Sequence, residues 1–173
     1  MKLIIPYTKF LSVQAQHLYM DDWDPEYIDV SGNPHLYYEV LKELWSLQDD
    51  FILLEHDIIP WPGALNTFEN CSEPWCAFKY LYPPSGHLVI ANGCVRFRKE
   101  LMNLIPDLFD IIESNDGTFF VTSEDPKDWH AIDGRMGAIL TNKLNGFVHV
   151  HNPPVVHLKE DISGQLVGEV VED

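Results

Sequence analysis

Apolar blocks alternate along the chain with polar, turn-forming segments, and the spacing inside each block separates strands from helices. Leu3 to Ile5 form a short apolar run before Pro6, and FILL at 51–54 is a second, uninterrupted run. Between them, apolar residues recur at helical spacing over 34–47, whereas the acidic segment 20–34 has the composition of a loop. This order predicts a strand, a crossover helix and a second parallel strand.

The rest of the chain continues the alternation. The pattern predicts a short helix at 62–70, strands at 75–80 and 87–97, a helix at 99–112 interrupted near Pro106, and a short strand at 118–122. A further helix is expected from Pro126, followed by a strand over 147–158 that turns at Asn152 to Pro154. Because no repeat, low-complexity tract or linker interrupts the chain, residues 1–173 are expected to form one α/β domain.

Charge narrows the choice of partners. The chain carries 11 Lys and Arg against 27 Asp and Glu, a net charge of −16, which argues against nucleic acid as a partner. An anionic ligand such as a nucleotide diphosphate would need a divalent cation between itself and the protein. The sequence shows no membrane-spanning stretch and no signal-peptide pattern, so a cytoplasmic location is expected.

Three cysteines, Cys71, Cys76 and Cys94, are too few for a disulfide framework. The first two lack the second ligand pair of a structural zinc site, so all three are expected to be ordinary buried thiols.

The most informative stretch is the charged triplet that ends the FILL strand. Glu55, His56 and Asp57 stand where ligands bind in open α/β sheets, beyond the carboxyl ends of parallel strands. Strand alternation would direct Glu55 and Asp57 to one side and His56 to the other, and a carboxylate pair suits Mg²⁺ or Mn²⁺. A solvated turn before Pro60 is the alternative, but the apolar residues that follow favour partial burial of the triplet.

The segment LLEHDIIPWPGAL resembles the DxD motif region of GT-A fold glycosyltransferases. NGCVRFRKELM, DWHAIDGRM and HVHNPPVVHL follow in the order of that family's acceptor-side stretch, catalytic-acid helix start and C-terminal histidine segment. More narrowly, EHDIIPWPGAL with EPWCAFKY and NGCVRF resembles small glycosyltransferase-like proteins of actinobacteria and their phages. The resemblance implies a single GT-A-like, Rossmann-like domain with a mixed, mostly parallel sheet flanked by helices. Glu55 stands where the motif has its first Asp, and the part of the chain before the motif is short for this family.

The resemblance also implies a metal site. Asp57 would bind Mn²⁺ or Mg²⁺ directly, and Glu55 would bind the metal, the ribose or a metal-bound water. Among the three C-terminal histidines, His157 is the first candidate for a further ligand because it follows the Pro-Pro turn, and His151 is the second. An imidazole ligand would weakly favour Mn²⁺ over Mg²⁺. Each histidine taken alone is more often a structural residue.

Asp133 is the candidate general base. It interrupts an otherwise apolar helical stripe that includes Trp129 and Met136, and such a position raises a carboxyl pKa towards neutrality. Trp129 would stack on an acceptor group. The alternative is that Asp133 pairs with Arg135 or Arg96, or lies exposed at the edge of the stripe.

The remaining candidates concern the donor. Tyr7 and Thr8 follow the first strand, where a GT-A fold holds the nucleoside base, and Asp21 and Asp22 offer carboxylates that can accept hydrogen bonds from a base. A solvated acidic loop is the alternative reading of Asp21 and Asp22. Gly93 would let the backbone approach the donor sugar, although a strand glycine more often marks a bulge.

The sequence therefore predicts a metal-dependent, inverting glycosyltransferase that moves a sugar from a nucleotide donor to a hydroxyl acceptor. Two alternatives remain open: a metal-dependent phosphoesterase that uses the same acids to activate water, and a non-catalytic sugar- or nucleotide-binding module. Asp133 separates them, because neither alternative needs a tuned base beside an aromatic platform.

Overall fold

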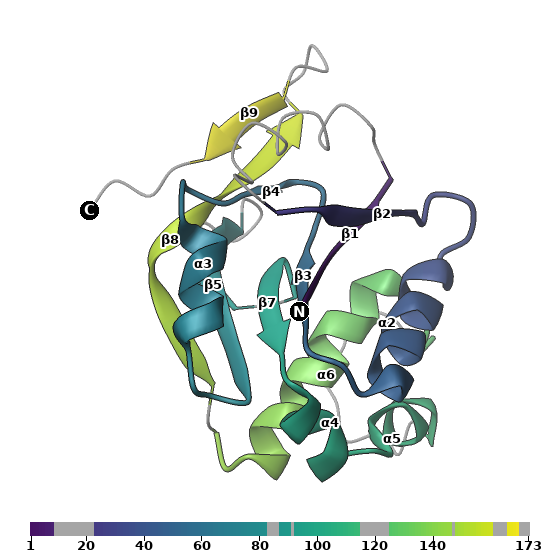
Figure 1. Cartoon of the computed structure of the whole chain (residues 1–173). Helices are drawn as coiled ribbons and strands as arrows, with labels where there is room; N and C mark the ends of the chain where they lie inside the picture. Colours follow the sequence, from purple (N-terminus) through teal and green to yellow (C-terminus); the bar gives the residue numbers. More distant parts are fainter. Residues whose placement is uncertain are drawn as a thin grey trace.

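The computed structural model describes residues 1–8, 23–82, 87–90, 92–114, 125–146, 148–160 and 166–169. Its elements alternate between strands and helices (Figure 1), as the sequence pattern predicts. In chain order they are β1 (Lys2–Tyr7), β2 (Pro25–Asp29), α2 (Leu36–Leu47), β3 (Phe51–Leu54), β4 (Ile58–Ile59), α3 (Ala64–Asn70), β5 (Trp75–Tyr82), β6 (His87–Val89), β7 (Cys94–Phe97), α4 (Lys99–Leu104), α5 (Leu108–Ser114), α6 (Trp129–Lys143), β8 (His149–Glu160) and β9 (Leu166–Glu169).

The strands form a mixed sheet in the order β2-β1-β3-β7-β5-β8-β4, with β6 on β5 and β9 on β8. Within the described residues, β1 runs parallel to β2 and β3, and β5 runs parallel to β8, whereas the other five pairings are antiparallel. The predicted α/β class and the mixed sheet are confirmed, but the expectation of a mostly parallel sheet is wrong. The connection from β5 to β6 is shorter than the dozen or more residues that a crossover needs, and both β6 and β7 run antiparallel to β5.

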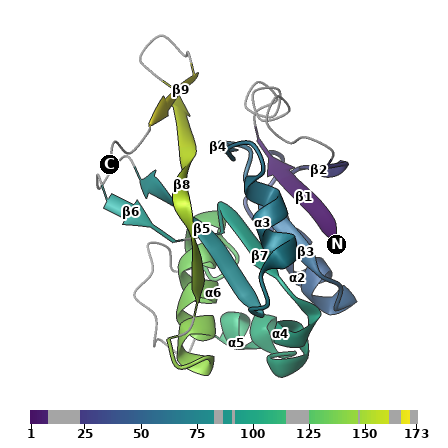
Figure 2. The same ribbon diagram turned by 60° about the vertical axis from the view of Figure 1, so that its left-hand side comes forward.

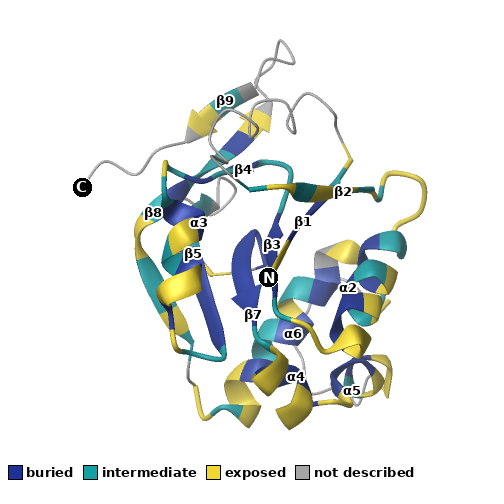
Figure 3. Cartoon of the chain, in the orientation of Figure 1, coloured by how far each residue is buried: buried dark blue, intermediate teal, exposed yellow. Residues whose placement is uncertain are grey.

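Helices cover the two faces of the sheet unequally (Figures 1 and 2). The larger hydrophobic core lies between one face and α2, α4, α5 and α6, whereas the smaller core on the opposite face includes buried residues of α3. All four residues of β3 are buried (Figure 3). Alternate residues of the strand belong to the two different cores. The uninterrupted FILL run therefore reflects burial on both faces of the sheet.

Two features near the N-terminus differ from the prediction. Pro6 lies inside β1 rather than ending it, and the segment predicted as a loop contains β2. Pro6 is opposite Ile28, whereas the pairing of β1 with β3 extends only to Ile4 and Leu53. The missing N–H of Pro6 therefore removes no hydrogen bond from the β1–β3 ladder.

The C-terminal strand also departs from the prediction. β8 runs through Asn152 to Pro154 without ending, and the extra residues are absorbed by a register shift opposite Phe78 and Tyr80. The break between α4 and α5 near Pro106 is confirmed, whereas the strand predicted at 118–122 lies outside the described residues. In the described part of the chain, none of the helices has the length and apolar character needed to cross a bilayer.

Candidate active site

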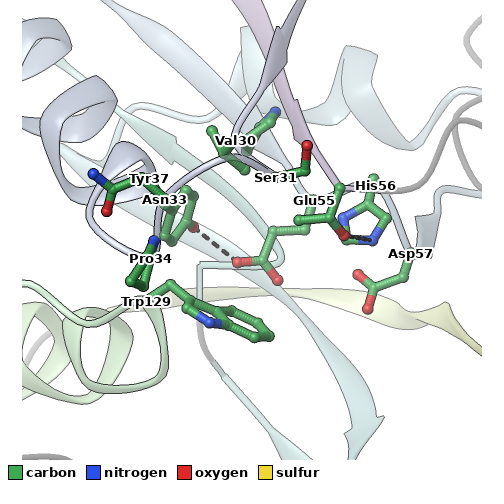
Figure 4. A pocket seen from close by; sticks show the side chains of 11 residues that line it. Val30, Ser31, Asn33, Pro34, Tyr37, Glu55, His56, Asp57 and Trp129 are labelled. Atoms are coloured by element: carbon green, nitrogen blue, oxygen red, sulfur yellow. Dashed lines mark hydrogen bonds between the residues drawn. The ribbon is translucent and has the colours of Figure 1, made fainter.

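A pocket of about 500 Å³ opens at the carboxyl ends of the parallel strands β1, β2 and β3 (Figure 4). The triplet 55–57 after β3 forms one wall, the loop 30–34 before α2 forms the opposite wall, and Trp129 closes a third side. This volume falls within the range of small-molecule sites. The strand-end location predicted from the sequence is therefore where the structure has its pocket.

Glu55 is fixed by both main-chain and side-chain contacts. Its N–H donates to the carbonyl of Gly93 at 2.8 Å, and its Oε1 accepts a hydrogen bond from the hydroxyl of Tyr37 on α2 at 2.8 Å. Burial, followed by the negative charges of Asp133 and Asp57, raises the pKa of Glu55 well above its ordinary value. Glu55 thus faces the α2 and α6 side of the sheet, as expected from its alternation with the core residue Leu53.

Asp57 lies beside His157, which comes from the other end of the chain. The Nε2 atom of His157 is 3.2 Å from Asp57 Oδ2, and among the described residues the buried Oδ1 has no hydrogen-bond partner. Burial tends to raise the pKa of Asp57, but the hydrogen bond from His157 and the nearby charge of His56 outweigh it and lower the pKa. Asp57 is therefore held ionised, with one oxygen left to accept a ligand.

The β4–β8 pairing brings Asp57 and His157 together. Ile58 lies opposite His157 in this antiparallel pair, and the N–H of Leu158 donates to the carbonyl of Asp57 at 2.6 Å. The ring of His157 also stacks on Tyr80 of β5, with centroids 5.4 Å apart. Main-chain bonds and ring stacking thus fix the histidine next to the carboxylate.

Asp133 approaches the same acids from α6. Its Oδ1 accepts a hydrogen bond of 2.7 Å from the side-chain amide of Asn92, a residue that is 4% exposed. Burial raises the pKa of Asp133 to about 7, and the charge of Asp57 adds to this effect, whereas the bond from Asn92 works against it. Three carboxylates that repel one another therefore converge, two from the turn after β3 and one from α6.

The ion pair between Asp133 and Arg96, which the sequence left open as an alternative, does not form in the structure. The guanidinium of Arg96 lies in the other core layer, where it donates to the main-chain carbonyls of Phe68, Cys71 and Glu73. The apolar stripe around Asp133 is confirmed, because Ile132, Met136 and Leu140 are all buried in the larger core.

Trp129 and Thr8 line the pocket together with Glu55 and Asp57, whereas Asp133 and His157 are not among its lining residues. Trp129 is 49% exposed and faces Glu55 and Asp57 across the cavity (Figure 4). Thr8 lines the opposite part, and its hydroxyl lies 3.1 Å from Nε2 of His56. The prediction that His56 turns away from the two acids is wrong, since the chain leaves the strand at Glu55 and turns, which brings His56 into the same pocket.

Three predicted site residues lie elsewhere. His151 is placed with Cys71 and His149, six residues along β8 from His157, so the structure does not bring it to Asp57. Gly93 is buried, and a Cβ atom added there would lie 2.7 Å from Tyr80 Cε1 and 3.0 Å from Ile58 Cγ1, which gives this glycine a packing role. Tyr7 does not line the pocket, and Asp21 and Asp22 lie outside the described residues.

Sequence reasoning missed Tyr37 and Asn92. Tyr37 fits the helical apolar spacing of α2, and that spacing marks it as a core residue rather than a donor to Glu55. Asn92 stands in a turn before β7, where asparagine is common for local reasons. The sequence placed Tyr37 near the start of a predicted helix and Asn92 before the end of a predicted strand, and it gave no other indication that either residue belongs to the site.

Comparison with known proteins finds solved structures with a similar fold but no related sequence. No family model matches the chain, and no curated protein sequence matches it significantly. Among solved structures, A197 from STIV aligns with a TM-score of 0.57 and 10% identity over 99% of this chain and 96% of that one. A glycosyltransferase involved in glycosylation of the major capsid of PBCV-1 aligns with a TM-score of 0.48 and 12% identity, over 88% of this chain and 83% of that one. The likeness to A197 shows a shared fold and, at this identity, nothing about activity.

Proposed function

We propose that this chain is a metal-dependent, inverting glycosyltransferase that moves a sugar from a nucleotide donor to a hydroxyl acceptor. The observation that carries the proposal is the buried Oδ1 of Asp57, without a hydrogen-bond partner among the described residues, at a pocket shared with Glu55 and next to His157. A buried carboxylate oxygen with no donor is unfavourable unless a cation or a ligand satisfies it.

The residues at this point fit a hard divalent cation. The 3.2 Å contact between Asp57 Oδ2 and His157 Nε2 is a hydrogen bond in this structure, and a cation would take the place of its proton, because two neighbouring ligands of an octahedral ion at about 2.1 Å also lie about 3 Å apart. Asp57 and His157 would hold Mn²⁺ or Mg²⁺, with Glu55 positioned behind them by Tyr37. When bound, the cation would supply positive charge that offsets the diphosphate of the donor.

Asp133 is assigned as the base that removes the proton of the acceptor hydroxyl. A carboxyl group with a pKa of about 7 is divided nearly equally between its acid and base forms at neutral pH, and this balance suits general-base catalysis. The amide of Asn92 holds Oδ1, which leaves Oδ2 to accept a proton. Neither a phosphoesterase nor a binding module needs a base tuned in this way.

Trp129 and Thr8 are assigned to opposite ends of the ligand. The exposed indole of Trp129 offers a flat apolar surface on which an acceptor can stack. Thr8 follows β1, at the end of the pocket where the nucleoside would lie, and its hydroxyl can share hydrogen bonds with His56 and a ligand. Tyr7, Asp21 and Asp22 are retained only as candidates for the nucleoside side.

Thermal unfolding with nucleotide diphosphates tests the proposal. UDP, GDP, CDP, ADP and dTDP are added singly, with Mn²⁺ or with EDTA, and at least one should raise Tm only when Mn²⁺ is present. Asp57→Asn and His157→Gln should abolish this shift. Glu113→Gln, a carboxylate-to-amide change on α5 outside the pocket, should retain it.

The products of turnover separate the alternatives. A transferase incubated with the matching nucleotide sugar releases an intact nucleoside diphosphate, which chromatography resolves, whereas a phosphoesterase that attacks the diphosphate with water releases a nucleoside monophosphate and a sugar phosphate. Absence of any nucleotide shift at all manganese concentrations would overturn the proposal.

A further inference from the structure

A second cluster of metal-binding side chains lies away from the pocket, on the face of the sheet covered by α3. It consists of Cys71, His149 and His151, and one ligand atom of each lies within 4.8 Å of the other two. Cys71 directly follows α3, and the two histidines belong to β8 (Figure 2). None of the three lines the pocket that holds Asp57.

Strand register places both histidines on this face. His149 lies opposite Cys76 and His151 lies opposite Phe78 in the parallel β5–β8 pair, and residues directly opposite each other share a face. Cys76 and Phe78 belong to the smaller core beneath α3. The two imidazoles therefore point toward the end of α3, and their ring centroids are 4.7 Å apart.

Cys71 is held rigidly by its own main chain. Its carbonyl accepts hydrogen bonds from Arg96 at 2.8 Å and from Arg98 at 2.6 Å, and Arg96 also binds the carbonyl of Phe68 at 2.6 Å. Two guanidinium groups thus lock the C-terminal end of α3 onto the sheet.

His151 has an unsatisfied nitrogen. Its ring packs against Phe68 and Phe78, with centroids 5.3 and 5.2 Å away, and its buried Nε2 has no hydrogen-bond partner among the described residues. A buried, unpaired imidazole nitrogen is unfavourable, and coordination of a metal would satisfy it.

We propose that Cys71, His149 and His151 bind a zinc ion that connects the end of α3 to β8. One thiolate and two imidazoles form a borderline-soft ligand set that suits Zn²⁺, unlike the oxygen-rich set at Asp57. Ligand atoms around a tetrahedral zinc ion lie about 3.5 Å apart, so the three side chains must close in from the observed 4.8 Å limit. Because His149 is exposed, an ion can enter from solvent and keep water as its fourth ligand.

Cobalt provides the spectroscopic test, because Co²⁺ takes the same tetrahedral sites as zinc and absorbs visible light. Metal-free full-length protein titrated with Co²⁺ should develop ligand-field bands and a thiolate-to-cobalt charge-transfer band, the latter saturating at one equivalent of ion bound at the cysteine, and zinc should bleach the charge-transfer band. Cys71→Ala should remove the charge-transfer band, and His149→Ala should weaken Co²⁺ binding at least tenfold without touching the core.

Two control variants keep this test independent of the proposed function. Cys94→Ala removes a buried thiol outside the cluster, and Asp57→Asn alters the pocket, so both should retain the wild-type cobalt spectrum. The proposal is overturned if wild-type protein gives no charge-transfer band, or if the band persists in Cys71→Ala. Loss of the band in Asp57→Asn would also overturn it, since the bound ion would then belong to the pocket.

Discussion

The side chains of Asp57 and His157 lie 3.2 Å apart although 100 positions separate them in the sequence. The hydrogen bond from the N–H of Leu158 to the carbonyl of Asp57 forms part of the same contact. Since the main chain sets this spacing, the pair is preorganised, and a ligand does not have to draw the two residues together.

Packing behind His157 should be sensitive to the size of residue 93. Gly93→Ala would place a methyl group 2.7 Å from the ring of Tyr80, on which His157 stacks. We expect a loss of about 1–3 kcal/mol in the free energy of unfolding from overpacking, together with weaker Mn²⁺-dependent nucleotide binding. Urea denaturation and calorimetric titration measure the two effects.

Gly137→Ala is the matched control for that substitution. A methyl group at Gly137 of α6 meets nothing within 4 Å, so the helix should gain about 0.5–1 kcal/mol and ligand binding should be unchanged. Equal stability changes of the same sign in the two alanine variants would contradict the packing role of Gly93.

Substitution of two adjacent tyrosines on α2 distinguishes an effect on the geometry of the site from an effect on the stability of the fold. Tyr37 donates to Glu55 at the pocket, whereas Tyr38 donates to Glu113 on α5 at 2.5 Å. Tyr37→Phe should weaken Mn²⁺-dependent nucleotide binding roughly 10-fold, because a residue behind the metal ligands loses its orientation. Tyr38→Phe should cost about 1 kcal/mol of stability and leave binding intact. If both variants bind nucleotide like the wild type, Glu55 does not depend on Tyr37.

Asp133 should cost the metal-free protein stability at neutral pH. Its pKa rises from the ordinary 3.8 to about 7 on folding, so ionisation disfavours the folded state progressively between these values and fully above pH 7. Asp133→Asn should therefore be more stable than wild type by about 1–3 kcal/mol at pH 8, with the difference shrinking toward pH 4. Urea denaturation in EDTA across this range measures it, and a difference independent of pH would contradict the assignment.

The same variant tests the proposed role of Asp133. Loss of a general base should reduce turnover by about 10²–10⁴-fold while Mn²⁺-dependent nucleotide binding persists. Asparagine at position 133 retains the shape of the side chain and can still accept the bond from Asn92. Undiminished turnover would exclude Asp133 as the base.

The local sequence pattern predicted the strand-end acids because their signal is contained in a few neighbouring residues. Glu55 and Asp57 directly follow a strand whose apolar run identifies it as buried on both faces, and their place at the pocket follows from that. Asp133 was identified in the same way, as a carboxylate within an apolar helical stripe. The placement of residues that depends only on local spacing could thus be predicted.

Pairings between distant segments could not be predicted in this way. β4 has two residues, too few for a periodic signal, yet its pairing with β8 selects His157 as the neighbour of Asp57. In the sequence, His157 differs from His149 and His151 only in following the Pro-Pro turn, and the register of β8 against β4 and β5 is what places His157 beside Asp57 and the other two on the face covered by α3. The prediction of a mostly parallel sheet was wrong for a related reason. Strand direction depends on the course of the connections, which the local pattern does not reveal.

Glu113 should show a pH dependence opposite to that of Asp133. Its Oε1 accepts hydrogen bonds from Lys42 at 2.7 Å and from Tyr38 at 2.5 Å, and these contacts lower its pKa from the ordinary 4.5 to about 2. The ionised form therefore stabilises the fold above pH 4.5, and this contribution is lost as the pH falls toward 2. Because the side chain is 34% exposed, solvent screening limits the contribution to about 1 kcal/mol. Glu113→Gln should be less stable than wild type by that amount at pH 7 and equal to it near pH 2, as measured by urea denaturation. A gap that stays constant down to pH 3 would show that packing of the side chain, rather than its charge, stabilises this contact.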